Sequence, residues 1–155
     1  MKPNYLTILI TTLCIFFNAC HNSNTAPQLQ LADSLIDKRA DSALCILEKL
    51  SIEEISNKSA KAMYALLLTE ALDKNFKSHR NDSLILIAVD YYKDNSNNKL
   101  KTKAYYYLGR VYQDNKEYIK ATEAYLTSSN IKYIDNQLVT VIKIQMICKC
   151  KYKTI

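Results

Sequence analysis

The chain has 155 residues, a formal net charge of +6, two prolines and one glycine. Its length suits one domain with a hydrophobic core. Both prolines, Pro3 and Pro27, lie near the N-terminus. A sheet with several tight turns needs more proline and glycine than this, so we expect an all-α fold. Lys2 supplies one positive charge and residues 136–155 supply four without any acid, which leaves +1 for residues 3–135. That region has no excess of basic residues for phosphates, which argues against nucleic-acid binding.

The first twenty residues have the layout of a secretory signal. The apolar stretch at residues 5–17 is shorter than the ~20 residues that a membrane-spanning helix needs. It ends in Phe-Asn-Ala-Cys at residues 17–20, which resembles a bacterial lipobox. The resemblance implies that residues 1–19 are a signal peptide and that the thiol of Cys20 becomes lipidated. A cleaved signal peptide followed by a chance cysteine is the alternative.

Residues 20–30 are polar and predict a flexible, lipidated tether. The tether lacks the acidic cluster that some surface-exported lipoproteins carry after the cysteine. We therefore expect a membrane-anchored lipoprotein of the bacterial cell envelope that faces the periplasm.

The next segments predict a short helical hairpin at residues 31–39 and 41–50. Asp41 is the expected N-cap of its second helix, and the apolar residues of that helix should be buried. Cys45 lies on this helix and is expected to be buried as a small apolar side chain. Ser51 stands three residues before Glu54, the spacing of a capping box.

Residues 59–75 and 81–93 predict a second pair of helices. Their expected buried residues follow helical spacing: Ala62, Tyr64, Leu67, Leu68, Ala71 and Leu72 on the first helix, and Leu84, Ile85, Ala88, Tyr91 and Tyr92 on the second. A shift of 41 residues places Tyr64 on Tyr105 and Leu67 on Leu108, which indicates an internal repeat. The same shift puts Leu68 at the position of Gly109, so we expect looser packing in this earlier pair.

Residues 103–128 contain the only glycine, Gly109, inside a segment that otherwise reads as helix. A glycine there costs roughly 1 kcal/mol relative to alanine, and the close approach of a second helix would explain it. Large and small residues recur at steps of three and four on both halves of the segment. The positions that should pack the two helices together are Tyr105, Leu108, Gly109, Tyr112, Ala121, Tyr125 and Ser128.

These seven residues at these spacings resemble a tetratricopeptide repeat, which is a 34-residue helix pair. Tyr105 replaces the usual tryptophan, and Tyr133 stands where the family has proline. The resemblance implies a short right-handed α-solenoid of antiparallel helix pairs, with about three pairs in residues 31–135. An ordinary helical hairpin that carries the same residues is the alternative.

In this family the first helix of each pair lines a concave groove that holds the partner. The corresponding groove positions here are Lys103, Tyr106, Arg110 and Gln113. The resemblance implies that Lys103 and Arg110 meet an acidic peptide or a carboxyl terminus, with Tyr106 stacked beside it. Four ordinary exposed residues are the alternative.

The repeat pattern stops near residue 135, because Lys143 stands where the next small residue should fall. Residues 136–155 are a divergent basic tail, either an incomplete repeat of a shortened longer protein or a divergent last helix. Cys148 and Cys150 lack a second cysteine pair, so a metal site there is not expected.

The sequence contains no catalytic constellation that we can identify. With one glycine there is no phosphate-binding loop. His79 has no ligand at metal-binding spacing and is expected to be a solvated loop residue. We therefore expect no enzymatic activity, no metal and no cofactor.

The function we expect is a non-catalytic module that binds a peptide or protein partner while anchored to a bacterial membrane. One alternative is the periplasmic sensory part of a signalling regulator, present here in shortened form. A glycan-capture lipoprotein is a third possibility, but it should expose tryptophan, and the chain has none.

Overall fold

The computed structural model describes residues 25–79 and 81–131, and this part of the chain contains helices and no strand. The signal peptide, Cys20 and the tail lie outside the described residues. Six α-helices and one short 3₁₀-helix follow one another in the described part: α2 (Thr25–Leu35), α3 (Ala40–Leu47), the 3₁₀-helix Ile52–Glu54, α4 (Lys58–Lys74), α5 (Ser83–Tyr92), α6 (Asn98–Asp114) and α7 (Tyr118–Asn130). The expected all-α fold is confirmed.

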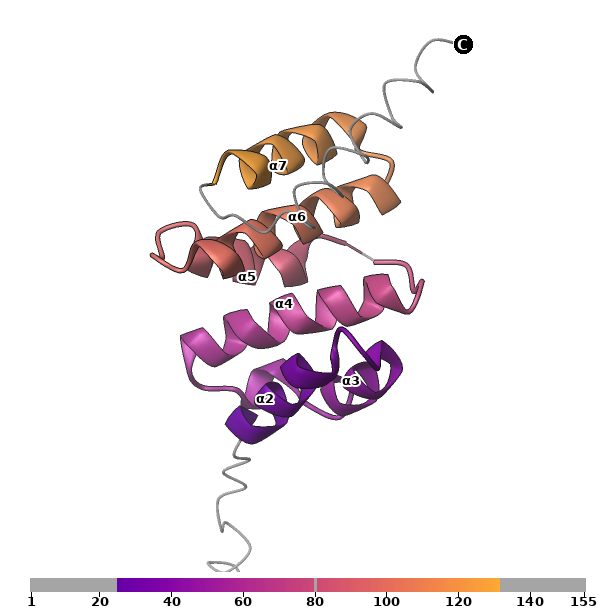
Figure 1. Ribbon diagram of the computed structural model, residues 1–155, viewed down its shortest axis with the longest axis vertical. Helices are drawn as coiled ribbons and strands as arrows, with labels where there is room; N and C mark the ends of the chain where they lie inside the picture. The colour runs from indigo at the N-terminus through magenta and orange to yellow at the C-terminus, as the bar shows by residue number, and fades with distance from the viewer. Residues whose placement is uncertain (1–24, 80, 132–155) are drawn as a thin grey trace, which may run out of the picture.

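The six helices pack in sequential pairs. α2 pairs with α3, α4 with α5, and α6 with α7, and each pair contacts the next. The first helices also touch one another directly, since α4 contacts both α2 and α6. Figure 1 shows the pairs following one another along the longest axis, with α2 and α3 at one end and α7 at the other.

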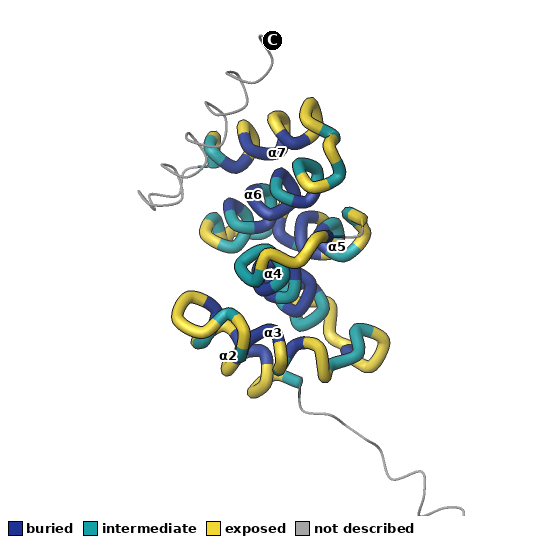
Figure 2. Tube along the Cα trace, turned by 90° about the vertical axis from the view of Figure 1, so that its right-hand side faces the viewer, coloured by how far each residue is buried: buried dark blue, intermediate teal, exposed yellow. Residues whose placement is uncertain are grey.

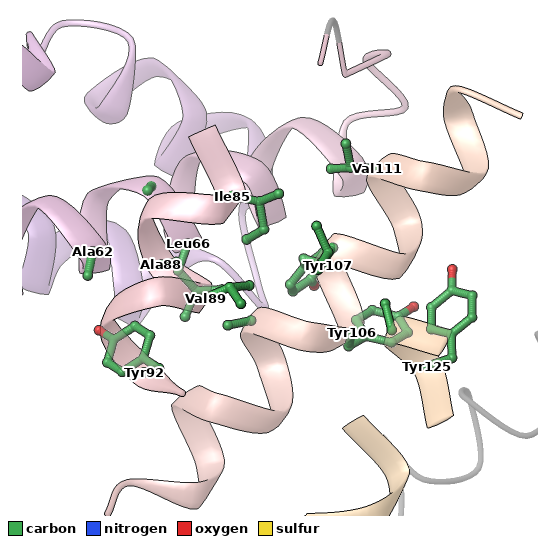
Figure 3. Packing of buried hydrophobic residues seen from close by; sticks show 14 of the residues in the cluster. Ala62, Leu66, Ile85, Ala88, Val89, Tyr92, Tyr106, Tyr107, Val111 and Tyr125 are labelled. Atoms are coloured by element: carbon green, nitrogen blue, oxygen red, sulfur yellow. The ribbon is translucent and has the colours of Figure 1, made fainter. Parts of the chain in front are cut away.

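Helix α4 lies at the centre because two of its sides are apolar. Tyr64 and Leu67 join a cluster with α2 and α3, whereas Ala62 and Leu66 join a second cluster with α5, α6 and α7. Figure 2 shows the buried positions of α4 facing its neighbours, and Figure 3 shows the second cluster at close range. The two cores therefore share this helix, which couples one end of the molecule to the other.

Helices α4 and α6 are matched elements. Each has 17 residues, and they begin at Lys58 and Asn98, 40 residues apart. The side chains of Asn57 and Asn97 cap their first turns by accepting backbone hydrogen bonds. This offset of 40 corrects the expected 41. It places Thr69, not Leu68, at the position of Gly109, and Thr69 is buried where Leu68 is only half-buried.

Both helices also end in the same way. After Asn75 and Asn115 the chain turns through Phe76 (φ 55°) and Lys116 (φ 62°), which adopt the left-handed conformation. The amide of Lys77 then donates to the carbonyl of Leu72, six positions spanned by one bond, as in a Schellman motif. Asparagine thus ends these helices, and bulky residues occupy the position where glycine is usual.

Three local predictions near the N-terminal end were wrong. Residues 25–30 belong to α2 and are not an extended tether; Leu29 is buried there, and Pro27 lies in the first turn, where its missing N–H costs nothing. Asp41 lies inside the first turn of α3, and Arg39 is at the N-cap position. No capping box forms at Ser51, because the residues after it form the 3₁₀-helix.

Candidate interaction site

Gly109 is the point of closest approach between α6 and α7. A Cβ built on Gly109 would lie 2.4 Å from Cε1 of Tyr125, and two more ring carbons would lie within 2.9 Å. Tyr125 is fully buried, and its hydroxyl donates to Oε1 of Gln113 at 2.9 Å. The expected reason for a mid-helix glycine is confirmed: the flat ring of Tyr125 needs the space that any side chain would fill.

Most of the other expected packing residues are also buried. Leu108, Ala121 and Ser128 are at most 7% exposed, and the Ser128 hydroxyl donates to the Thr102 carbonyl at 2.9 Å. Tyr105 and Tyr112 are only half-buried and lie at the edge of the cluster. The stripe of packing residues therefore has a dense centre and a partly solvated rim.

Ion pairs join the successive first helices α2, α4 and α6. Asp37, just after α2, lies 2.5 Å from Lys74 Nζ, and Lys74 lies 3.1 Å from Glu70. Glu70 is almost fully buried, and its other oxygen is 2.6 Å from Nζ of Lys103 on α6. The Lys74 ammonium lowers the pKa of Asp37, mainly through its hydrogen bond. We call this set the charge ladder: Asp37, Lys74, Glu70 and Lys103.

Arg110 makes a second link between α4 and α6. Its Nε and its terminal nitrogen both contact Oδ1 of Asp73, at 2.8 and 2.7 Å. Both side chains are mostly buried, at 21% and 14% exposure. Charge-assisted contacts of this kind fix orientation as well as adding energy.

His79 makes a third link and corrects its expected role as a solvated loop residue. It is 6% exposed. Its Nε2 lies 3.1 Å from the carbonyl oxygen of Thr69, and its Nδ1 lies 2.7 Å from Oδ2 of Asp114. A carbonyl oxygen can only accept, so Nε2 carries a proton and donates. The ring thereby ties the end of α6 to α4.

The four predicted groove residues all point into contacts within the chain. Lys103 pairs with Glu70, Arg110 with Asp73, and Gln113 accepts from Tyr125. Tyr106 was expected on the exposed face but is 7% exposed, with its ring centroid 5.8 Å from that of Tyr125 (Figure 3). Arg110 alone of the four lines a surface hollow; partner binding by this set remains a prediction.

A hollow of about 280 Å³ opens where α4 and α6 end. Its lining comes from three successive contacts already described and from the turn after α4: Asp73, Phe76, Lys77, Ser78, Arg110 and Asp114. Phe76 is 99% exposed at its rim. Sequence reasoning missed Phe76; the signal that it overlooked is a phenylalanine directly after a helix-ending asparagine, where glycine is usual.

Cys45 is exposed, which corrects its expected burial. Ala43, Leu44 and Leu47 define the buried side of α3, and Cys45 lies on another side of that short helix. No three histidine, cysteine or acidic side chains gather as metal ligands among residues 25–79 and 81–131. None of the helices in those ranges is long and apolar enough to cross a membrane.

Comparison of the chain with protein-family models, with curated proteins and with solved structures finds no match to any of them.

Proposed function

We propose that the protein is a non-catalytic interaction module of the tetratricopeptide type, anchored to a bacterial membrane through Cys20. The partner, a peptide or protein, binds on the face formed by α2, α4 and α6, at the hollow beside Phe76. Lipidation of Cys20 after removal of residues 1–19 holds the module on the periplasmic side of the envelope.

Three features support a repeat of this type. α4 and α6 have equal lengths and equivalent caps, 40 residues apart. Gly109 admits the ring of Tyr125 between two helices of one pair. The first helices of successive pairs contact each other, as they do in stacked helical repeats. Together they favour a short right-handed solenoid over an unrelated helical bundle.

Phe76 is the observation that carries the proposed partner site. A residue with a Cβ in the left-handed conformation costs on the order of 1–2 kcal/mol. An aromatic ring that is 99% exposed gains nothing from burial within the chain. Lys116, at the equivalent turn after α6, shows that a hydrophilic residue is accepted at this position. An apolar ring at a strained, exposed turn beside a hollow is the kind of side chain that anchors a partner.

The charges around the hollow indicate the partner's chemistry. Arg110 is already paired with Asp73, and Asp114 with His79. A purely acidic peptide would have to compete with these internal carboxylates. The site therefore fits a peptide that places an apolar side chain against Phe76 and neutral hydrogen-bonding groups along Arg110 and Asp114.

Substitution of Phe76 by glycine tests the site without unfolding it. Phe76→Gly relieves the left-handed strain, so the variant should be as stable as the wild type or more stable, yet recover less partner in a crosslinking pull-down. Lys116→Gly makes the same backbone change at the matched turn and should keep full recovery. Equal recovery with all three proteins would reject the hollow as the partner site.

Anchoring is tested separately by metabolic labelling with a radioactive fatty acid. The wild-type chain should incorporate label and sediment with membranes, and Cys20→Ser should do neither. Label on the Cys20→Ser variant would refute lipidation at this cysteine while leaving the partner site open to the pull-down.

A further inference from the structure

Helix α7 has one apolar side that no other described helix covers. It packs on α6 through Ala121, Ala124, Tyr125 and Ser128. Ile119 and Leu126 are 72% and 46% exposed. They are seven residues apart, two turns, so they lie on the same side of α7 with Thr122 between them. In Figure 2 the exposed positions of α7 face away from α6. We call Ile119, Thr122 and Leu126 the outer stripe.

The sequence that follows α7 contains an apolar segment of matching size. Residues 138–147 read Leu-Val-Thr-Val-Ile-Lys-Ile-Gln-Met-Ile, with one charge in ten residues. Residues 132–137 connect this segment to the described part of the chain. Even a few extended residues span on the order of 20 Å, about twice the 8–10 Å between packed helix axes. The segment can therefore reach the outer stripe.

We propose that residues 138–147 of the same chain cover the outer stripe of α7. The alternative occupant, a second copy, is disfavoured by concentration. A segment tethered by so short a connection has an effective concentration on the order of millimolar, well above that of a free chain in solution. The positive charges of residues 149–153 then remain in water beyond the covered side.

The proposal is tested on the full chain by coupling between the two surfaces. Ile142→Ser with Ile144→Ser should lower the urea midpoint of unfolding in the wild-type background. The same pair should have a much smaller effect when Ile119→Ser and Leu126→Ser have already made the stripe polar. Leu31→Ser, at an exposed apolar residue of α2, is the matched control and should leave the full effect of the tail substitutions. Additive effects in both backgrounds would overturn the proposal.

A photo-crosslinking amino acid at position 126 identifies the occupant directly. Mass spectrometry of a mixture of isotopically heavy and light chains should find adducts between position 126 and residues 138–147 of the same chain. Mixed heavy–light adducts would show a second copy on the stripe, and lipid adducts would show a membrane. Either result, or the absence of any adduct to residues 138–147, would overturn the proposal.

Discussion

At the scale of single residues, Gly109 shows how one missing side chain sets the distance between two helices. Alanine at this position should gain roughly 1 kcal/mol of helix propensity. Its Cβ, however, would overlap three ring carbons of Tyr125, which is buried and tied to Gln113. Overpacking of this kind costs typically 1–3 kcal/mol. Gly109→Ala should therefore lower the free energy of unfolding by roughly 1–2 kcal/mol, measured by chemical denaturation.

The control for this prediction removes the obstacle. In a Tyr125→Leu background the ring atoms near Gly109 are gone, so Gly109→Ala should become neutral or stabilising. A stabilising effect of Gly109→Ala in the wild-type background would contradict the close approach, because it is the result expected of a helix position with open space.

At the scale of elements, Glu70 joins α4 to α6 through a carboxylate that is almost fully buried. Although Lys103 Nζ is 2.6 Å away, Oε2 of Glu70 has no hydrogen bond of good geometry, so the contact is mainly a charge pair. Removing one partner of a buried ion pair costs about 3–5 kcal/mol. Glu70→Ala should destabilise near the lower end of that range, because Lys74 and Lys103 can extend toward water.

An exposed pair in the same molecule provides the comparison. Lys77 and Glu48 also join neighbouring helix pairs, at 3.0 Å, but both are about half exposed. Lys77→Ala should change the free energy of unfolding by no more than about 1 kcal/mol. If Glu70→Ala and Lys77→Ala had equal effects in urea unfolding, burial of Glu70 would not be what makes the ladder matter.

The helices themselves were predictable from the sequence because their signals are local. Asparagine caps and apolar spacing placed α4 and α6 to within a few residues. The links between helices were not predictable in this way. His79 binds groups on Thr69 and Asp114, which are 10 and 35 residues away, so nothing beside His79 in the sequence reveals them. The shift of 41 failed for the same reason: side-chain matches fixed it, whereas the matched caps give 40.

Some of the missed features were nonetheless encoded locally. The burial of Tyr106 follows from its place beside Tyr107 on the side of α6 that meets α4 and α7, which only the contact between helix pairs defines. The exposure of Cys45, by contrast, follows from the spacing of Leu44 and Leu47, which already mark the buried side of α3. Arg110 was correctly singled out, but its carboxylate partner Asp73 was not, because the two residues are 37 positions apart.

At the scale of the whole molecule, buried tyrosines make the stability depend on alkaline pH. Burial raises the pKa of Tyr92 to about 12, and it also raises the pKa values of Tyr107 and Tyr125. In the unfolded chain these phenols lose their protons near pH ~10. Above that pH the unfolded state binds fewer protons than the folded state, so the free energy of unfolding falls as pH rises. It falls by about 1.4 kcal/mol per pH unit for each such tyrosine.

This predicts full stability at neutral pH and a steep loss that begins near pH ~10 and continues through the folded pKa of Tyr92. Urea unfolding at a series of alkaline pH values measures the slope, and tyrosinate absorbance reports deprotonation. Tyr92→Phe removes one titrating group while keeping the ring in its cluster with α4 and α5, so the slope should decrease by one proton's share. Because the two cores share α4, the loss should occur as one transition detected by both absorbance and circular dichroism. Early deprotonation of all tyrosines with no loss of helix would instead mean that these rings are open to water.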